Sequence, residues 1–227
     1  MQESTKEAVT SWIKLQSPKI VLDCPAGNGW LLSTLPNSII DGIDLFHDPN
    51  SGYRNHICAD LDYGIPSELP KYDLIACCEG IEHFGNPELF FRTCNEHLDH
   101  GGVLLITTPN IWQPSSKLQY NLRGFFPNFP CLIGKIKKGS HMHIMPWSFP
   151  QLYLFLTLSG FVEIKLHHQP MSKPKHLYEK FLVLPQKLYC KNKERKAVNQ
   201  VEKDFWRQTG SAASTLGRNL FITAKKS

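Results

Sequence analysis

Two carboxylates and a histidine follow an apolar run in the middle of the chain, in the stretch Glu79-Gly80-Ile81-Glu82-His83. If this stretch begins a helix, Glu79, Glu82 and His83 share one face, because side chains three and four positions apart are neighbours. Burying two carboxylates and an imidazole costs free energy unless they have partners or a function. The imidazole of His83 could take a proton from a hydroxyl group, since its ordinary pKa lies near physiological pH. We therefore predict that His83 acts directly on a reacting hydroxyl.

A glycine-containing turn follows the first apolar run, in Asp23-Cys24-Pro25-Ala26-Gly27-Asn28-Gly29. Gly27 and Gly29 allow the backbone to turn tightly and to approach a ligand closely. The turn lies at the carboxyl end of a predicted central strand, which is where open α/β sheets bind ligands. An ordinary strand–helix connection is the alternative interpretation. The turn alone therefore indicates a ligand site only weakly.

Two further aspartates follow the next two predicted strands. Asp44 comes about 20 residues after Asp23, where a carboxylate can accept hydrogen bonds from both ribose hydroxyls of a nucleoside. Asp60 follows the third strand and is placed to accept a hydrogen bond from an adenine amino group. Each aspartate could instead stabilise a local turn, which is frequent at strand ends. Together with the glycine turn, they predict a site for a nucleoside-containing cofactor.

Alternating strands and helices must position these groups. Apolar and β-branched runs predict strands at residues 19–24, 38–45, 55–59, 72–78, 103–107, 161–166 and 217–224. Helical periodicity predicts helices at residues 3–15, 30–35, 87–98 and 150–159, with helical stretches around 177–184 and 198–207. Such an alternation favours an α/β fold in which helices cover both faces of a mostly parallel sheet.

The 227 residues suit a single domain, 1–227, that contains two insertions. Residues 109–148 are rich in proline, glycine and aromatic side chains, and we expect a lid-like binding segment there. Residues 167–216 form a second, helical insertion. The aromatic side chains and Arg123 of the first insertion could contact sugars and bases alike, so they do not identify a ligand.

Composition bounds the class of protein. The formal net charge is +5, and the basic residues concentrate in the C-terminal third, where a solvated helix face is the simplest interpretation. Seven cysteines, an odd number, have no zinc-finger spacing, which favours a reducing compartment and hence the cytoplasm. The polar N-terminal stretch does not resemble a signal peptide, and no apolar run reaches the length of a membrane-spanning helix.

Four stretches, taken in order, resemble the motifs of class I S-adenosylmethionine-dependent methyltransferases. They are VLDCPAGNG, IIDGIDL, CADL, and YDLIACCEGIEHF followed by LDHGGVLLITTPN. The resemblance covers residues 18–167 and the last strand, and Pro25 replaces the first family glycine. It implies a Rossmann-like, seven-stranded, mostly parallel sheet with helices on both faces and an antiparallel last strand. The implied cofactor is S-adenosylmethionine, bound by Asp23, Pro25, Ala26, Gly27, Gly29, Asp44, Leu45, Asp60, Leu61 and Glu79.

A nicotinamide dinucleotide is the rival cofactor. Its pyrophosphate requires a glycine pattern with a third glycine that leads into a helix N-terminus. The sequence offers Pro-x-Gly-x-Gly-Trp at this point, without that third glycine. An uncharged sulfonium cofactor has no need of a phosphate site, so the methyltransferase interpretation is favoured.

The Glu-x-x-Glu-His pattern with a later histidine resembles two groups within this family. In small-RNA 3′-terminal 2′-O-methyltransferases, four such side chains hold a divalent metal. The other group is the bacterial methyltransferases of surface-polysaccharide gene clusters, to which the chain is most similar through TTPN, HIMPWSFP and its length. The matching residues are Glu79, Glu82, His83 and His143, which imply catalytic roles for His83, Glu82 and His143 and leave a divalent metal as an alternative. Without a metal, Glu79 could line the adenosine pocket and Glu82 could pair locally.

These observations predict an O-methyltransferase that acts on a sugar hydroxyl of a glycan or glycolipid. An RNA 2′-O-methyltransferase with a divalent metal is the second hypothesis, although a basic stripe or added RNA-binding domain is lacking. A catalytically silent domain that binds the cofactor is the third. Phe125-Phe126 and residues 132–138 could touch a membrane that carries a lipid-linked glycan, or they could pack on the protein's own core.

Overall fold

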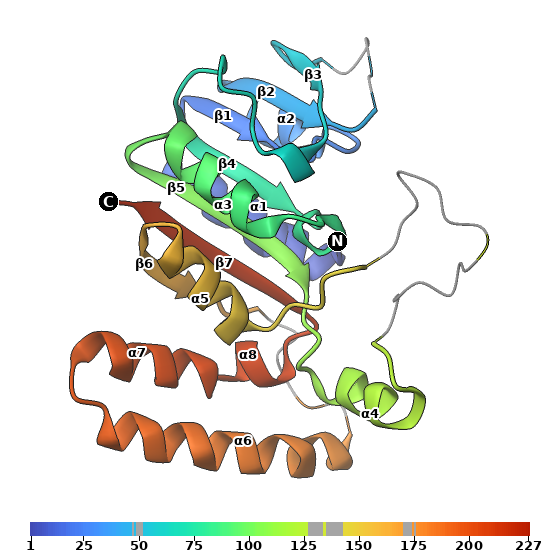
Figure 1. Ribbon diagram of the computed structural model, residues 1–227, viewed down its shortest axis with the longest axis vertical. Helices are drawn as coiled ribbons and strands as arrows, with labels where there is room; N and C mark the ends of the chain where they lie inside the picture. The colour runs from blue at the N-terminus through green and yellow to red at the C-terminus, as the bar shows by residue number, and fades with distance from the viewer. Residues whose placement is uncertain (47, 49–51, 127–133, 135–142, 170–173, 175) are drawn as a thin grey trace.

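The computed structural model describes residues 1–46, 48, 52–126, 134, 143–169, 174 and 176–227. Within them, seven strands form one sheet in the order β3-β2-β1-β4-β5-β7-β6, shown in Figure 1. The strands are β1 (Ile20–Asp23), β2 (Ile39–Asp44), β3 (His56–Cys58), β4 (Tyr72–Cys78), β5 (Leu98–Pro109), β6 (Phe161–Leu166) and β7 (Asn219–Lys226). The first five pair in parallel, whereas β7 runs antiparallel between β5 and β6. The predicted fold class is therefore confirmed.

Helices cover both faces of this sheet and also form a separate group below it (Figure 1). The α-helices are α1 (Glu3–Gln16), α2 (Trp30–Thr34), α3 (Pro87–His97), α4 (Pro114–Arg123), α5 (Phe149–Leu158), α6 (Leu177–Lys196), α7 (Gln200–Thr209) and α8 (Ala212–Leu216). Two single turns of 3₁₀ helix, η1 (Leu61–Tyr63) and η2 (Ile81–His83), follow β3 and β4. In the part of the chain described, no helix is long and apolar enough to span a membrane.

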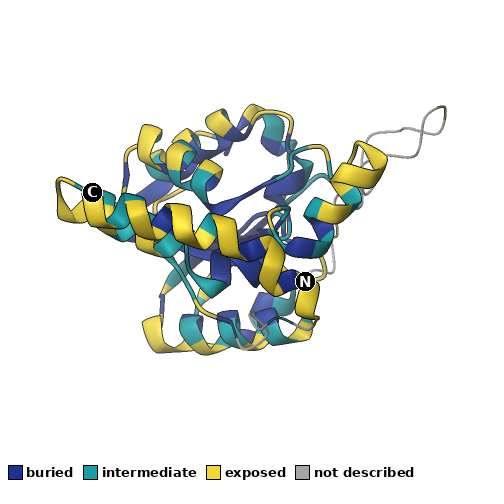
Figure 2. Cartoon of the chain, turned by 90° about the horizontal axis from the view of Figure 1, so that it is seen from below, coloured by how far each residue is buried: buried dark blue, intermediate teal, exposed yellow. Residues whose placement is uncertain are grey.

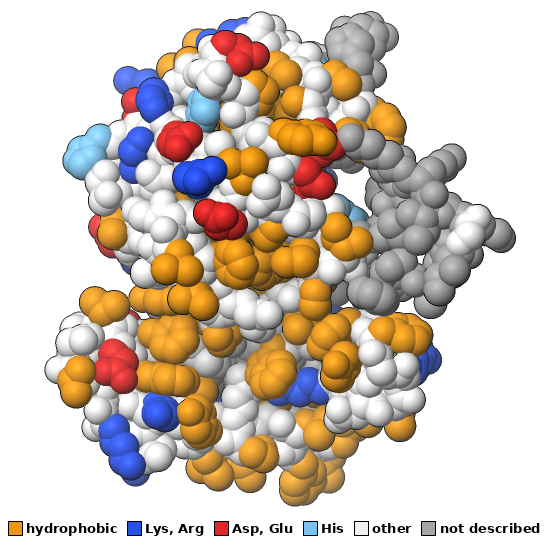
Figure 3. All heavy atoms as spheres, viewed as in Figure 1, with side chains coloured by type: hydrophobic (Ala, Val, Ile, Leu, Met, Phe, Trp, Pro, Cys, Tyr) orange, Lys and Arg blue, Asp and Glu red, His pale blue; other side chains and the backbone are white. Residues whose placement is uncertain are grey.

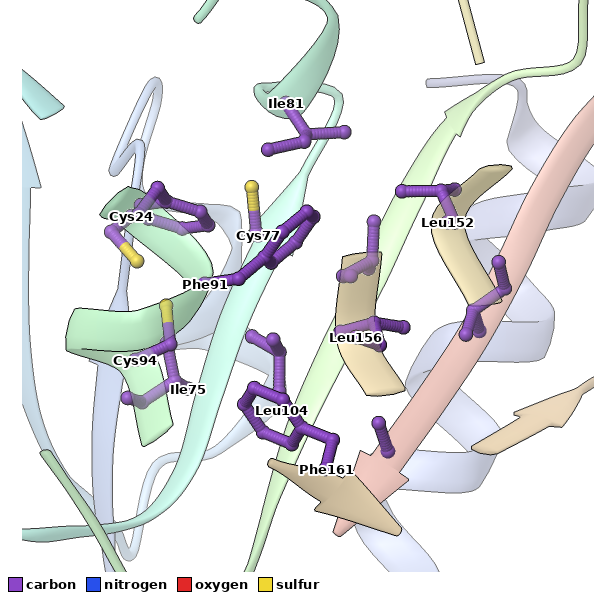
Figure 4. Close-up of a cluster of buried hydrophobic side chains, with 14 of the residues drawn as sticks. Cys24, Ile75, Cys77, Ile81, Phe91, Cys94, Leu104, Leu152, Leu156 and Phe161 are labelled. Atoms are coloured by element: carbon purple, nitrogen blue, oxygen red, sulfur yellow. The ribbon is translucent and has the colours of Figure 1, made fainter. Parts of the chain in front are cut away.

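The core has two layers because successive strand residues point to opposite faces of the sheet. On one face, Ile75 of β4 packs in the cluster that includes Phe91 of α3 and Leu156 of α5 (Figure 4). On the other face, the neighbouring Leu74 packs with residues of α1 and α2. The strands at the centre of the sheet are apolar on both sides, as expected of parallel strands covered by helices.

The strand order reverses at β1, since β2 lies on one side of it and β4 on the other. The connections that leave β1 and β4 therefore turn to opposite sides of the sheet, and a crevice opens between them at the carboxyl ends. All the predicted cofactor residues end or follow β1, β2, β3 or β4. The topology thus places them around one crevice.

The first insertion contains a helix that its composition does not suggest. At the start of α4, the side-chain oxygen of Gln113 accepts a hydrogen bond from the backbone N–H of Ser115, and Pro114 occupies the first turn. Gly124 ends the helix in a left-handed conformation with φ 78°. The lid-like segment predicted from its proline, glycine and aromatic content therefore contains a helix, with Pro114 at its start and Gly124 directly after its end.

Parts of both insertions lie outside the described residues. They are 127–133 and 135–142 of the first and 170–173 and 175 of the second. Most of the 132–138 segment predicted to approach a membrane falls there. In the second insertion the predicted helical stretches correspond to α6 and α7, and α6 extends twelve residues beyond the predicted end at 184, to Lys196.

Candidate active site

A cavity of about 740 Å³ opens at the carboxyl ends of the central strands. Residues from the turns after β1, β2, β3 and β4 line it, and Glu3 and Lys6 of α1 form a further wall. Eight of the ten predicted cofactor residues are among the lining residues, namely Pro25, Ala26, Gly27, Asp44, Leu45, Asp60, Leu61 and Glu79. A nucleoside-sized molecule fits a cavity of this volume, since small-molecule sites generally measure about 300–1,000 Å³.

The turn after β1 adopts the conformation that its glycines predict. Gly27 and Gly29 have φ angles of 53° and 68°, which non-glycine residues rarely adopt. A Cβ atom on Gly27 would meet no atom within 4 Å, so the requirement there is for the left-handed backbone and not for space. Gly29 does not line the cavity; it precedes α2 as the N-cap residue and so directs the chain away from the site.

The carboxylate of Asp44 joins this turn to the end of β2. One carboxylate oxygen, Oδ2, accepts a hydrogen bond from the backbone N–H of Gly27 at 2.9 Å. The other, Oδ1, accepts one from the backbone N–H of Phe46 at 3.2 Å. Each carboxylate oxygen can accept a further hydrogen bond, so Asp44 fixes the turn and still has capacity for ribose hydroxyls.

Asp60 both caps a local turn and lines the cavity. Its carboxylate caps η1 by accepting a hydrogen bond from the backbone N–H of Asp62 at 3.2 Å. The residue also lines the cavity, beside Leu61. The local turn therefore holds the Asp60 side chain at the cavity wall.

Asp23 lies behind the cavity and does not line it. Its carboxylate is buried and accepts a hydrogen bond at 2.6 Å from the hydroxyl of Tyr53, which also lies 3.1 Å from the carbonyl oxygen of Ala26. Burial raises the pKa of Asp23, and within the described residues its Oδ1 has no hydrogen-bond partner. This arrangement supports the Ala26 backbone from behind, so a direct contact between Asp23 and a cofactor stays a prediction.

The end of β4 approaches the turn after β1 very closely. A Cβ atom on Gly80 would lie 2.2 Å from Cδ of Pro25, so no side chain fits at this position. The preceding residue, Glu79, has a φ of 55°, an unusual conformation for a residue with a side chain. Its Oε1 accepts a hydrogen bond at 2.8 Å from Nδ2 of Asn219 in β7, and burial raises the pKa of Glu79. Sequence reasoning missed Gly80 and Asn219, because each is defined by a distant contact.

The stretch directly after β4 forms the single 3₁₀ turn η2 and not the start of a longer helix, so the two carboxylates point in different directions. Glu79 precedes the turn and lines the large cavity, whereas Glu82 is buried behind it. Oε2 of Glu82 accepts a hydrogen bond from the hydroxyl of Thr108 at 2.9 Å, while Oε1 has no partner among the described residues. Burial, reinforced by the charge of Glu79, raises the pKa of Glu82 to about 8.

His143 returns to η2 from a distant part of the chain. The backbone N–H groups of Ile144 and Met145 both donate to the carbonyl oxygen of Glu82, at 2.9 and 3.0 Å. As a result, the rings of His83 and His143 meet edge to face with centroids 5.1 Å apart. The three side chains predicted to be catalytic, those of Glu82, His83 and His143, therefore lie together at one point.

These three side chains also form a candidate metal centre. One ligand atom from each lies within 4.8 Å of the others, and Glu79 falls outside this group. A carboxylate and two imidazoles suit a divalent transition metal by ligand type. The unpartnered Oε1 of Glu82 is consistent with such a ligand role.

A second, smaller cavity of about 80 Å³ lies on the other side of η2. Glu82 and His143 line it, together with Gln113 and Ser116 of α4 and with Arg218. His83, in contrast, lines the large cavity. The η2 turn is thus a partition between a cofactor-sized cavity and a smaller space that could admit part of a second molecule.

Two comparisons relate the sequence of this chain to known proteins. Residues 1–152 match a family described as methyltransferase domain. Over 108 residues, the chain is 31% identical to a ubiquinone biosynthesis O-methyltransferase of Glaesserella parasuis serovar 5 (strain SH0165), an alignment covering 40% of this chain and 46% of that protein. The chain thus spans less than half the length of this curated relative.

Two solved structures share the fold over nearly the whole chain. A SAM-dependent methyltransferase from Archaeoglobus fulgidus has a TM-score of 0.56 and 15% identity, covering 97% of this chain and 94% of that chain. The 1,6-didemethyltoxoflavin-N1-methyltransferase of Burkholderia thailandensis, solved with bound 1,6-didemethyltoxoflavin and S-adenosylhomocysteine, has a TM-score of 0.55 and 12% identity, covering 99% of this chain and 79% of that chain.

Proposed function

The chain belongs to the methyltransferase domain family and is an S-adenosylmethionine-dependent methyltransferase, and from this premise we propose that it transfers the methyl group to a hydroxyl oxygen. The observation that carries the proposal is the position of His83. Its side chain lines the cofactor-sized cavity and lies beside the buried Glu82 and the half-buried His143. An imidazole at this boundary can accept the proton of a hydroxyl group that approaches from the small cavity.

Residues of the large cavity divide the binding of the cofactor among them. S-adenosylmethionine supplies an electrophilic methyl group on a sulfonium centre. The Asp44 carboxylate is assigned to the ribose hydroxyls and Asp60 to the adenine amino group, while the Gly27 backbone allows close approach. Glu79 and His83 line the cavity at the end of β4, where the methyl group would be presented.

The reaction demands little chemistry from the protein beyond positioning and proton removal. Methyl transfer is an in-line displacement, so much of the barrier is overcome by holding the acceptor oxygen opposite the sulfonium. His83 accepts the acceptor's proton as the new oxygen–carbon bond forms. His143 holds the His83 ring edge to face, and Glu82 fixes the segment of His143 through its carbonyl oxygen.

A sugar hydroxyl of a glycan or glycolipid remains the first candidate acceptor, on the resemblance to polysaccharide-cluster methyltransferases. A phenolic hydroxyl is the second candidate, because the relative from Glaesserella parasuis is named as an O-methyltransferase of ubiquinone biosynthesis. Both are hydroxyl groups that His83 could deprotonate, and they differ in size, acidity and the apolar groups attached. An RNA 2′-hydroxyl is an outcome that the same experiment detects.

A divalent metal is the competing role for the same three side chains. Held by Glu82, His83 and His143, a cation would polarise an acceptor hydroxyl and promote loss of its proton. Metal-ligated His83 could not also be the base. Dependence of turnover on added manganese, zinc or iron after chelation would therefore assign these residues to metal binding and remove His83 from the proton transfer.

The test is a methyl-transfer assay with labelled S-adenosylmethionine and three acceptor classes: an oligosaccharide or glycolipid, a polyprenyl catechol, and an RNA oligonucleotide. Each reaction is run with EDTA and with added divalent metal. We expect stable labelling of an oxygen in one of the first two classes. Tight binding of S-adenosylhomocysteine without labelling of any hydroxyl class would contradict the proposal, as would label found on nitrogen or carbon.

A further inference from the structure

Helix α6 presents an apolar row to solvent. Leu177, Phe181, Leu184 and Leu188 have exposed fractions of 69%, 67%, 51% and 58%. Their spacing of four, three and four residues places them on one side of the helix. The opposite side, with Glu179, Val183 and Cys190, is buried against the rest of the molecule. Figure 2, which views the molecule from below, shows the long exposed helix faces on this side.

This orientation is the reverse of the usual one for a surface helix. A surface helix generally turns its apolar stripe inward and its polar residues to water. Here large apolar side chains occupy the outward face, and Tyr178, Leu182 and Tyr189 extend the apolar surface along one flank. Exposed contiguous apolar patches of this kind mark sites of interaction. Among the described residues, no element covers the row.

Basic residues accompany the apolar row. Six lysines and arginines lie in α6, against two acidic residues, one of which, Glu179, is buried. The other, Glu194, already pairs with Arg207 of α7 at 3.0 Å. The exposed Lys180 and Lys191 flank the apolar row, so their aliphatic stems can lie along it while the charges remain in water.

Helix α4 packs against the side of α6 that carries Gln186. Nζ of Lys117 in α4 donates a hydrogen bond to Oε1 of Gln186 in α6 at 2.9 Å and lies 4.2 Å from the ring centroid of Trp112. Leu118 and Leu122 of α4 are also exposed apolar side chains. In Figure 3, hydrophobic side chains gather along the lower edge of the molecule, over α6 and beside α4.

Helix α4 connects this surface to the small cavity. Its Gln113 N-cap and Ser116 line the cavity that Glu82 and His143 also line. A molecule held at the surface of α4 and α6 therefore has a short route to the acceptor side of the site. The surface and the cavity share one element.

We propose that this face of α4 and α6 docks on an anionic lipid membrane. An outward apolar row flanked by lysines is the pattern of a helix that lies in the interface plane, where the row enters the acyl boundary and the lysines meet lipid phosphates. A second copy of the chain fits less well, because a two-fold interface would bring the six basic residues of one α6 close to the six of its partner, and like charges repel. The docking goes beyond the transfer reaction and does not rest on the identity of the acceptor.

The experiment is co-sedimentation of the full chain with vesicles of phosphatidylcholine alone or with added phosphatidylglycerol. We expect binding that requires phosphatidylglycerol and weakens with salt. The double variant Phe181→Glu, Leu188→Glu and the charge variant Lys180→Glu, Lys191→Glu should each bind at least about tenfold more weakly. The matched control is Leu15→Glu, which changes an exposed leucine of α1, and thermal melting with S-adenosylhomocysteine binding shows that each variant is folded.

Three results would overturn docking. They are failure of the wild-type chain to prefer phosphatidylglycerol vesicles, equal binding by folded variants, and a wild-type dimer that the Phe181→Glu, Leu188→Glu variant dissociates without any vesicle binding. The last result would assign the face to contact between copies. Vesicle binding is measured without cofactor or acceptor, so its failure is distinct from failure of the proposed reaction.

Discussion

The carboxylate of Asp44 accepts a hydrogen bond from the backbone N–H of Gly27 at 2.9 Å, and so ties the end of β2 to the turn after β1. Asp44 is the last residue of β2 and Gly27 lies in the turn after β1, and the carboxyl ends of these neighbouring parallel strands meet at one edge of the sheet. Through this bond a single side chain both shapes the glycine turn and offers free acceptor capacity to the cavity. Loss of the carboxylate therefore affects two parts of the cofactor site.

Replacement of that side chain is the first prediction. Asp44→Ala should weaken S-adenosylhomocysteine binding at least about tenfold, because hydrogen bonds to a charged group contribute about 1.5–3 kcal/mol each. Isothermal titration calorimetry measures the change. The control is Asp99→Ala, which removes an exposed aspartate near the start of β5 that does not line the cavity. Equal affinity in wild type and Asp44→Ala would remove Asp44 from the site.

Close packing of Gly80 on Pro25 gives a second prediction. A Cβ atom at this position would lie 2.2 Å from Cδ of Pro25, so Gly80→Ala must displace the turn that lines the cavity. We expect a stability loss of about 1–3 kcal/mol and weaker S-adenosylhomocysteine binding in the folded variant. Gly124→Ala is the control, because it strains a left-handed residue in open space at the end of α4. If both variants bound the cofactor product as the wild type does, the Gly80 contact would have no role in the site.

His83 is assigned the proton transfer, which separates turnover from cofactor binding. His83→Ala should lower turnover about 10²–10⁴-fold, the usual contribution of a general base, with S-adenosylhomocysteine affinity nearly unchanged. Single-turnover measurements with the acceptor found in the transfer assay test this. The control is His100→Ala, which should retain full activity. His100 is exposed, and its ring lies 2.9 Å from an oxygen of the C-terminal residue Ser227. Unchanged turnover in His83→Ala would refute the assignment.

His167 predicts a specific pH dependence of stability. The imidazole stacks on Phe221 with centroids 4.3 Å apart and pairs with the Thr223 hydroxyl at 2.8 Å. Burial, followed by the charge of Lys165, lowers the pKa of His167 to about 4. The unfolded chain, with an ordinary pKa near about 6.5, takes up the proton more readily. The contribution of His167 to the free energy of unfolding is therefore complete above about pH 6.5 and declines as the pH falls toward 4.

The measurement is urea unfolding of wild type and His167→Gln between pH 7 and pH 4. Allowing for the partial exposure of the ring, we expect the wild type to lose about 1–2 kcal/mol more than the variant over this range. His168→Gln, which changes the exposed neighbouring histidine, should follow the wild type. Parallel curves for wild type and His167→Gln would show that the ring does not titrate in this way.

The buried carboxylate of Asp41 in β2 is expected to contribute strongly to the stability of this part of the sheet. It accepts hydrogen bonds from Arg54, Asn55 and Tyr72, the last two at 3.0 Å, and these partners together lower its pKa despite burial. Asp41→Ala leaves the Tyr72 hydroxyl and the Arg54 guanidinium without their acceptor. We expect a loss of about 1–3 kcal/mol in the free energy of unfolding, measured by chemical denaturation, because the buried Tyr72 hydroxyl loses its acceptor while the 40% exposed Arg54 side chain can bond to water.

Asp73→Ala provides the comparison for Asp41, since the Asp73 carboxylate accepts hydrogen bonds from the exposed end of β1, at the backbone N–H groups of Lys19 and Ile20. Solvent can replace those bonds, so the variant should lose less stability than Asp41→Ala. A similar loss in both variants would mean that burial of the Asp41 network contributes little.

Local sequence patterns were sufficient to predict the strands, the helices that cover the sheet and most of the residues that line the large cavity. Short β-branched runs alternate with helical periodicity, and that alternation permits few arrangements other than a parallel sheet covered by helices. The glycine turn follows β1, Asp44 ends β2, and Asp60 lies just after β3. Because parallel strands end at the same edge, their positions in the sequence were sufficient to bring them to one cavity.

Contacts between side chains that are far apart in the sequence could not be predicted from local patterns and depend on the folded structure. His143 reaches His83 only because the backbone of Ile144 and Met145 bonds to the carbonyl oxygen of Glu82. Glu79 and Glu82 point in opposite directions because the chain forms a single 3₁₀ turn here and not a longer helix. The position of Asp23 behind the cavity depends on its hydrogen bond with Tyr53. Local sequence patterns report the backbone conformation of a segment, whereas these contacts depend on where separate segments pack in space.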